Sequence, residues 1–256
     1  MKYLISLTTC LLVGSFCFAQ VHEIQQTRNA LQTVQTIGLN PNKTSAMVRG
    51  FDSRYKGVLG TPYLSADWIK GTLEEKTGDV FHDIYLRYNM VSDVIEMQSM
   101  TGKRVTLTKA QIVAFSLYLA ETDMHFQVFE DPEPAKKNKD PYFYAQVINS
   151  GPMKLLIRRR KYLAPRDNSI SPYHTQVNDI YKYRGDKYYV IFKGEAVPRR
   201  LRKNKKQLLS LMADHADEIK KFIKINYLNV GNDNHLTLII DHYNELALAT
   251  AKENQP

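Results

Sequence analysis

The chain has only two cysteines, and both lie within its first 17 residues. Beyond Cys17 the sequence therefore contains no disulfide and no thiol, which excludes thiol chemistry, cysteine metal sites and a disulfide-linked partner. Small exported domains that lack a sufficient core are usually rich in disulfides. This protein must instead be held together by its own packed core.

The sequence also lacks a hydrophobic run long enough to cross a membrane. Its longest apolar stretch, Leu4 to Phe18, follows a basic Lys2 and falls short of the roughly 20 residues that a transmembrane helix needs. Small residues at Cys17 and Ala19 are typical of leader cleavage. We expect residues 1–19 to be a signal peptide and the processed protein to be periplasmic, which leaves room for peripheral attachment to the outer membrane. A lipid anchor is less favoured, because Cys17 follows the large Phe16.

Acidic residues are in deficit. The formal charge of +9 falls to +8 when Lys2 is removed with the leader (9 − 1). Net charge bears on partners rather than on fold. An exported basic protein meets anionic lipid, acidic polysaccharide or acidic proteins, whereas nucleic acid is not expected in that compartment. Nothing in the sequence indicates a cofactor.

The remaining pattern predicts one α+β unit over residues 20–256. We expect a short helix at residues 21–34, an irregular loop at 49–64, a strand-rich core at 66–195 and C-terminal helices at 205–249. Short runs of alternating apolar residues, separated by turn residues, indicate an antiparallel meander or sandwich. The run Tyr188 to Phe192 is apolar on both faces, which is typical of a covered interior strand.

Two hairpins and two helix starts are predicted in more detail. One hairpin joins residues 142–148 to 153–161, and the other joins 179–184 to 187–193 through Gly185 and Asp186. Asp214 is expected to cap one helix, and Asn232 or Asp233 to cap the last one.

No catalytic or metal motif fits its required context. Ser53 and Lys56 match the S-x-x-K pattern and Lys76 to Gly78 match K-T-G, but about twenty residues separate them where the penicillin-binding fold needs a large helical region. His235 and His242 are seven residues apart, whereas helical metal ligands are normally three or four apart. We therefore predict no catalytic residue and no metal ligand.

Two basic clusters are the candidate binding residues, through contact with an anionic partner. Like-charge blocks are often interaction segments, although they also occur on solvated surfaces and guarded sheet edges. The clusters consist of Arg158, Arg159, Arg160 and Lys161, and of Arg199, Arg200, Arg202, Lys203, Lys205 and Lys206.

The segment from Gly60 to Gly71 reads G-T-P-Y-L-S-A-D-W-I-K-G. With the preceding residues from Arg49, it resembles a segment of uncharacterised exported proteins of Bacteroidetes-type bacteria. The lysine-rich ending from Lys205 to Tyr243 is similar too. The resemblance implies a diderm periplasm and brings no activity with it, because the shared glycines, proline and aromatics are of a structural kind.

Three functions remain open. The leading hypothesis is a non-enzymatic protein that binds an envelope component, such as an outer-membrane protein assembly. The second is a hydrolase of envelope polymers that uses carboxylates from separate strands. The third is direct binding of a polyanion or lipid headgroup through the basic clusters.

Overall fold

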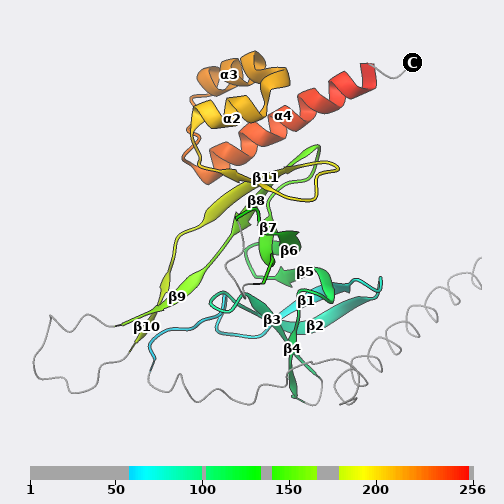
Figure 1. Ribbon diagram of the computed structural model, residues 1–256, viewed down its shortest axis with the longest axis vertical. Coiled ribbons are helices and arrows are strands. Elements are labelled where there is room, and N and C mark those ends of the chain that lie inside the picture. Colours follow the sequence, from blue (N-terminus) through cyan, green and yellow to red (C-terminus); the bar gives the residue numbers. More distant parts are fainter. Residues whose placement is uncertain (1–57, 100–101, 134–139, 166–178, 254–256) are drawn as a thin grey trace, which may run out of the picture.

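A computed structural model describes residues 58–99, 102–133, 140–165 and 179–253 (Figure 1). The expected signal peptide, the expected helix at residues 21–34 and most of the loop at 49–64 lie outside the described residues. The described chain forms an antiparallel sheet and a group of C-terminal helices, which confirms the α+β prediction. The strands are β1 (Ile69–Glu75), β2 (Val80–Asn89), β3 (Val94–Gln98), β4 (Arg104–Leu107), β5 (Ile112–Tyr118), β6 (Asp123–Glu130), β7 (Tyr142–Val147), β8 (Met153–Arg158), β9 (Lys161–Ala164), β10 (Ile180–Tyr183), β11 (Lys187–Phe192) and β12 (Arg199–Leu201).

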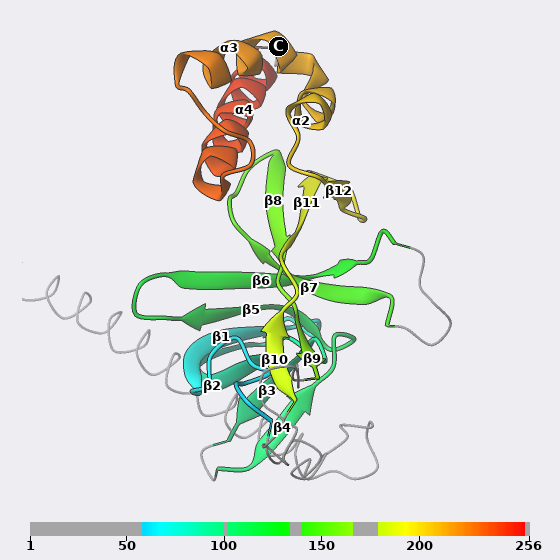
Figure 2. The ribbon, with the colours of Figure 1, turned by 90° about the vertical axis from the view of Figure 1, so that its left-hand side faces the viewer.

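Ten of these strands make one sheet, in the order β12-β11-β8-β7-β6-β5-β1-β2-β3-β4, and every neighbouring pair is antiparallel. The sheet twists strongly, so that β5 and β6 run across the molecule while β8 and β11 run along its length (Figure 2). The change of direction falls at β7 and β8, which are joined by only two residue pairs, Gln146 with Ile157 and Val147 with Leu156.

Alternation along the strands sets which side chains are buried. In β2 and β3 the inward residues Leu86, Tyr88 and Ile95 are buried, whereas their neighbours are at least partly exposed. Strand β5 departs from strict alternation because it contains a bulge: Glu74 pairs with Ala114 and Glu75 with Ile112. Val113 is the extra residue on the bulged strand, and it is 36% exposed although it belongs to an apolar run.

The predicted hairpin around Gly185 and Asp186 is wrong. Strand β10 pairs with β9, and β11 pairs with β8 and β12, so β10 and β11 do not pair with each other. They are successive parts of one arm of a long, bent hairpin whose other arm is β8 and β9. Gly185 has φ +84° and stands at the bend between β10 and β11. A Gly-Asp pair indicates a change of chain direction, but long-range pairing decides whether that change is a reversal or a bend.

The C-terminal helices are α2 (Lys205–Leu211), α3 (Ala216–Ile225) and α4 (Asp233–Glu253), with a short 3-10 turn, η3 (Ala213–His215), before α3. The side chain of Asn232 accepts a hydrogen bond from the amide of His235, which confirms the predicted cap of α4. The predicted cap at Asp214 is wrong: Asp214 lies in η3 and accepts a hydrogen bond from the Tyr243 hydroxyl.

Three groups of buried side chains form the core. The first lines the inner face of β1 to β7, where the rings of Tyr88, Phe115, Phe126 and Tyr144 are in contact. The second joins one face of β8 and β11 to the helices. The third lies on the opposite face of β8 and β11 and includes Tyr189. Strand β11 is therefore covered on both faces, as its apolar sequence predicts.

Candidate functional site

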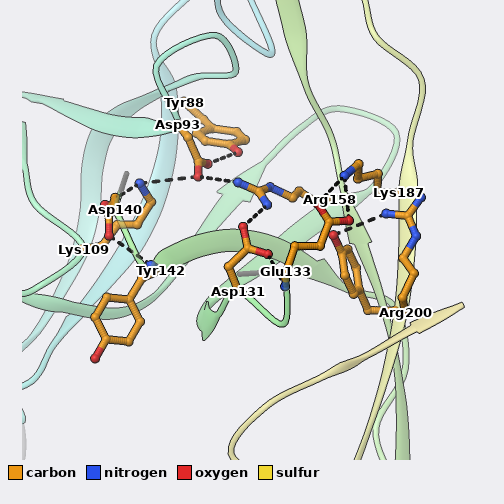
Figure 3. A network of polar contacts seen from close by, with 11 residues as sticks. Tyr88, Asp93, Lys109, Asp131, Glu133, Asp140, Tyr142, Arg158, Lys187 and Arg200 are labelled. Atoms are coloured by element: carbon orange, nitrogen blue, oxygen red, sulfur yellow. Dashed lines mark hydrogen bonds and ion pairs between the residues drawn. The ribbon is translucent and has the colours of Figure 1, made fainter. Parts of the chain in front are cut away.

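Charged side chains from four separate segments converge beside the long hairpin (Figure 3). Asp93 comes from the turn between β2 and β3, and Lys109 from the turn between β4 and β5. Asp131 and Asp140 come from the connection between β6 and β7, and Arg158 ends β8. We call these five residues the ionic network.

The carboxylates and cations of the ionic network alternate in space. The Lys109 ammonium lies 3.1 Å from Asp140 and 3.4 Å from Asp93. The Arg158 guanidinium lies 3.6 Å from Asp93 and donates a 2.8 Å hydrogen bond to Asp131. The result is a continuous chain from Asp140 to Asp131 in which each carboxylate faces a cation.

The centre of this network is removed from water. The side chains of Arg158 and Asp131 are 5% and 2% exposed. Burial opposes the charge on Arg158, but Asp93 and Asp131 outweigh burial and raise the pKa of the guanidinium above its ordinary value. The guanidinium also lies 4.4 Å from the centre of the Phe143 ring, so it covers part of the third core group.

A buried phenol completes the centre. Tyr88 donates a 2.7 Å hydrogen bond to Asp93. Burial, together with the charge of Asp93, raises the pKa of Tyr88 well above its ordinary value. Tyr88 therefore stays protonated and keeps donating to the carboxylate throughout the neutral range.

A more exposed extension of the network lies on the same face of β8 and β11. Lys187 donates hydrogen bonds of 2.9 and 3.0 Å to the two oxygens of Glu133. This hydrogen bond, opposed by burial, lowers the pKa of Glu133 below its ordinary value. Arg200 donates to the Tyr189 hydroxyl at 3.3 Å, so these residues form a polar cover over the third core group.

The hydrolase hypothesis requires carboxylates from separate strands, whereas the carboxylates that converge here come from turns and connections, and they converge on cations. Asp93 and Asp131 share one guanidinium, so neither is poised as an unpaired acid or base. The described residues contain no group of three His, Cys, Asp or Glu side chains arranged to hold a metal ion. The ion pairs of the network instead connect the turns of the meander to β8 of the long hairpin, which is a structural role.

A hydroxyl and an imidazole meet elsewhere, on the outer face of β5 and β6. The Ser116 hydroxyl lies 3.0 Å from Nδ1 of His125, whose Nε2 lies 3.2 Å from the Gln127 amide. Burial, followed by the charge of Lys154, lowers the pKa of His125. The third partner is an amide where a serine triad has a carboxylate, so the group would not stabilise the imidazolium that forms during acyl transfer.

The first predicted basic cluster is largely used inside the protein. Arg158 belongs to the ionic network, and Arg159 lies 3.0 Å from Asp186 and donates to Gln146. Lys161 donates to the backbone carbonyls of Thr61 and Tyr63, and burial lowers its pKa. Arg160 is partly exposed.

The second cluster is divided between the two faces of the sheet. Arg200 contacts Tyr189 in the third core group, whereas Arg199 and Lys203 lie over Phe192 and Tyr188 on the helix side. Arg199 also pairs with Glu195, and Lys203 lies 2.7 Å from Asp233. Arg202, Lys205 and Lys206 are exposed. The ten predicted residues do not form one exposed surface, and anion binding by them stays a prediction.

The string from Gly60 to Gly71 contributes to packing. Tyr63 and Trp68 place their ring centres 3.6 and 4.5 Å from the Arg87 guanidinium, and Arg87 pairs with Glu96 at 3.1 Å. Pro62 accepts a backbone hydrogen bond from Met90. Lys76 to Gly78 form the turn between β1 and β2, where the Lys76 ammonium lies 5.6 Å from the centre of the Tyr142 ring and the Thr77 hydroxyl donates to Asp79.

The paired histidines of α4 also have local partners. His242 stacks on Phe222 of α3, and Nδ1 of His235 accepts a hydrogen bond from the amide of Asn229. His242 thus holds α4 against α3, and His235 holds the start of α4 against the loop that follows α3.

Sequence reasoning missed two sets of residues. The carboxylates of the ionic network are scattered among turns, and no local pattern marks them. Lys220, Lys221 and Lys224 on α3 fall within the lysine-rich ending but are not among the predicted binding residues, although all three are exposed.

Comparison with known protein families, with curated proteins and with solved structures finds no match. Among the helices in the described residues, none combines the length and the apolar character needed to cross a membrane.

Proposed function

We propose that this chain is a non-enzymatic accessory protein of the cell envelope that binds another envelope component, such as an outer-membrane protein assembly. One observation carries the proposal: β9 and β10 form a narrow two-stranded arm with exposed tyrosines and cations. Tyr162 and Tyr183 are 37% and 48% exposed, and the Arg184 guanidinium lies over the Tyr162 ring. Tyrosine and arginine are enriched at protein interfaces, because they combine apolar area with a polar end.

The arm is attached firmly enough to present these side chains in a fixed position. Leu59 forms a β-bridge with Ile180 on β10. The backbone amide of Lys161 on β9 donates a hydrogen bond to the carbonyl of Met90, which directly follows β2. The arm lies at the end of the molecule opposite the helices (Figures 1 and 2). A partner could contact it without contacting the helices.

The test is affinity capture from gently extracted envelopes with the full chain as bait. We expect the wild type to retain a specific protein, and the double variant Tyr162→Ser, Tyr183→Ser to lose at least about tenfold of it, as loss of interface aromatics predicts. The matched control, Tyr85→Ser with Tyr142→Ser, removes two tyrosines that are 45% and 40% exposed and lie outside the arm. Recovery of the wild type only as a free monomer, or equal capture by both double variants, would contradict the proposal.

A further inference from the structure

The helices occupy one end of the elongated molecule, and α3 lies at its extremity (Figures 1 and 2). The buried side chains of Ile219 and Ile223 anchor α3 to the second core group. The stack of Phe222 on His242, with ring centres 4.0 Å apart, fixes α3 against α4. The outer side of α3 is therefore held in a defined orientation at the point where the molecule would first meet a flat surface.

This outer side carries three lysines whose charges are not paired. Lys220, Lys221 and Lys224 are exposed, and no carboxylate among the described residues lies within ion-pair distance of their ammonium groups. At 3.6 residues per turn they fall within about 100° of arc on the helix, and exposed Asp217, one turn earlier, lies in the same arc, so these four residues carry a net charge of +2 (3 − 1). The three lysines differ from Arg158, Arg159 and Lys203, whose charges face carboxylates inside the protein.

The end of α3 adds apolar side chains beside the lysines. Ile225 is 73% exposed and Tyr227 is 91% exposed, which are the largest values among the exposed large hydrophobic residues that the structure describes. Tyr227 has φ +51°, in the left-handed region, because the chain turns sharply there from α3 towards α4. Leu238, one turn before His242 on α4, is 51% exposed as well.

We infer that the tip of α3, formed by Lys220, Lys221, Lys224, Ile225 and Tyr227, docks peripherally on an anionic lipid surface. Lysine side chains can keep their ammonium groups among lipid headgroups while an adjacent aliphatic and an aromatic side chain enter the boundary of the acyl region. A cationic patch combined with apolar side chains supplies the two signals that reversible membrane binding needs. Charge complementarity thus selects an anionic bilayer, and the protruding position lets the tip reach a flat surface.

This inference goes beyond the proposed partner binding, because the tip and the β9–β10 arm lie at opposite ends of the molecule (Figure 1). Docking through α3 would leave the arm directed away from the bilayer and open to a second component. The two activities can therefore be separated by mutation.

The test is sedimentation of the full chain with vesicles of phosphatidylethanolamine and phosphatidylglycerol, compared with vesicles of phosphatidylcholine. We expect binding to the anionic vesicles only, weakening as salt is raised. The triple variant Lys220→Glu, Lys221→Glu, Lys224→Glu should bind at least about a hundredfold more weakly, because each lysine near an anionic surface contributes about fivefold. Glycerol phosphate in solution should not compete at matched phosphate concentration, which separates a lipid surface from a free phosphate as the ligand.

A matched triple variant, Arg202→Glu, Lys205→Glu, Lys206→Glu, makes the same change of charge at exposed residues outside the tip. It should stay within about threefold of the wild type, since long-range attraction between exposed charges is screened in salt. The variant Ile225→Ser, Tyr227→Ser should lose the binding that remains at high salt, because salt screens the lysine charges but not the burial of apolar side chains. If the α3 glutamate variant does not fold, the corresponding glutamine variant removes the three charges with less repulsion.

Three results would overturn the inference: no binding of the wild type to anionic vesicles, equal losses in the two glutamate variants, or retention on an acidic protein without retention on vesicles. The arm variant Tyr162→Ser, Tyr183→Ser should bind vesicles like the wild type. Failure of docking would therefore leave the proposed partner binding intact, and the reverse also holds.

Discussion

Asn244 of α4 pairs with the backbone of Met153 of β8 as a neighbouring strand would. Its side-chain oxygen accepts from the Met153 amide at 2.8 Å, and its nitrogen donates to the Met153 carbonyl at 2.9 Å. Asn244 is 4% exposed. The nearby Gly151 has φ +134° and leaves room for this side chain, because a Cβ there would lie 2.7 Å from its amide nitrogen. One amide thus fastens the helices to the sheet.

Replacing this amide by a carboxylate should loosen that attachment. In Asn244→Asp the donor to the Met153 carbonyl is lost and a charge is buried, so we expect a loss of about 2–3 kcal/mol in the free energy of unfolding. Urea denaturation measures the loss. Asn229→Asp is the matched control, because the Asn229 side chain only accepts, from the Gly231 amide. A control loss as large as that of Asn244→Asp would show that the paired amide has no special role.

Gly71 is a second position where the fold leaves no room. A Cβ added there would lie 2.0 Å from the Ser116 carbonyl oxygen on the neighbouring strand. Gly71→Ala must therefore push β1 and β5 apart, and we expect a loss of about 3 kcal/mol or more. Gly78→Ala is the comparison: Gly78 has φ +91° with nothing within 4 Å, so it should cost only about 1 kcal/mol of left-handed strain. Similar losses in thermal denaturation would contradict the close approach.

The ionic network predicts a large difference between two arginines. Arg158→Leu removes the guanidinium from between two carboxylates, one of them 2% exposed, and should cost about 3–5 kcal/mol of folding stability. Arg199→Leu breaks an ion pair in which the arginine side chain is 55% exposed and should cost less than about 1 kcal/mol.

Adding Asp131→Leu to Arg158→Leu should recover part of the larger loss, since the buried Asp131 carboxylate is then no longer left without the Arg158 guanidinium, while Asp93 keeps Lys109 at 3.4 Å. Chemical denaturation of the wild type, the two arginine variants, the single variant Asp131→Leu and the double variant measures these terms. Additive losses at positions 158 and 131 would mean that the two side chains do not act as a pair.

The buried Tyr88 phenol should make the free energy of unfolding depend on pH at alkaline pH. Its pKa is raised well above the ordinary value in the folded protein by burial and by Asp93, whereas the unfolded chain ionises near pH 10. The unfolded state therefore releases a proton first, and stability should fall as pH rises above about 10.

In Tyr88→Phe the free energy of unfolding should fall less steeply above about pH 10 than in the wild type. The comparison is made after subtracting the loss of stability that the substitution causes at pH 7. Denaturant titrations between neutral and alkaline pH give the slope. An unchanged alkaline slope would show that Tyr88 ionises in the folded state as readily as in the unfolded chain.

Local patterns predicted the elements well where burial follows a simple period. Leu86 and Ile95 alternate with outward residues, and Ile219 and Ile223 mark one face of α3, so these strands and helices could be read directly. The second hairpin could not be, because Gly185 and Asp186 permit either a reversal or a bend. Only the pairing of β10 with β9, on a segment about twenty residues away, decides between them.

The site was less predictable than the fold. Arg158 and Arg159 look like part of an exposed basic run, since the sequence alone does not place Asp93, Asp131 or Asp186 near them. In the folded protein these carboxylates pair with Arg158 and Arg159, so two of the cations predicted to bind a partner are neutralised within the protein. Exposed charge remains at Arg202, Lys205 and Lys206 of the second cluster, and α3 adds three ordinary helical lysines that face solvent.

The sequence by itself determined the absence of cysteine beyond residue 17, the positive charge, and the periods that make the chain α+β. These properties depend on composition and on residues close together in the chain. The tertiary structure alone decided which cations are neutralised, which strands pair with each other, and that the outer side of α3 lies at one end of the molecule. Those outcomes depend on contacts between residues far apart in the chain, because ion pairing and strand pairing act through distance in space.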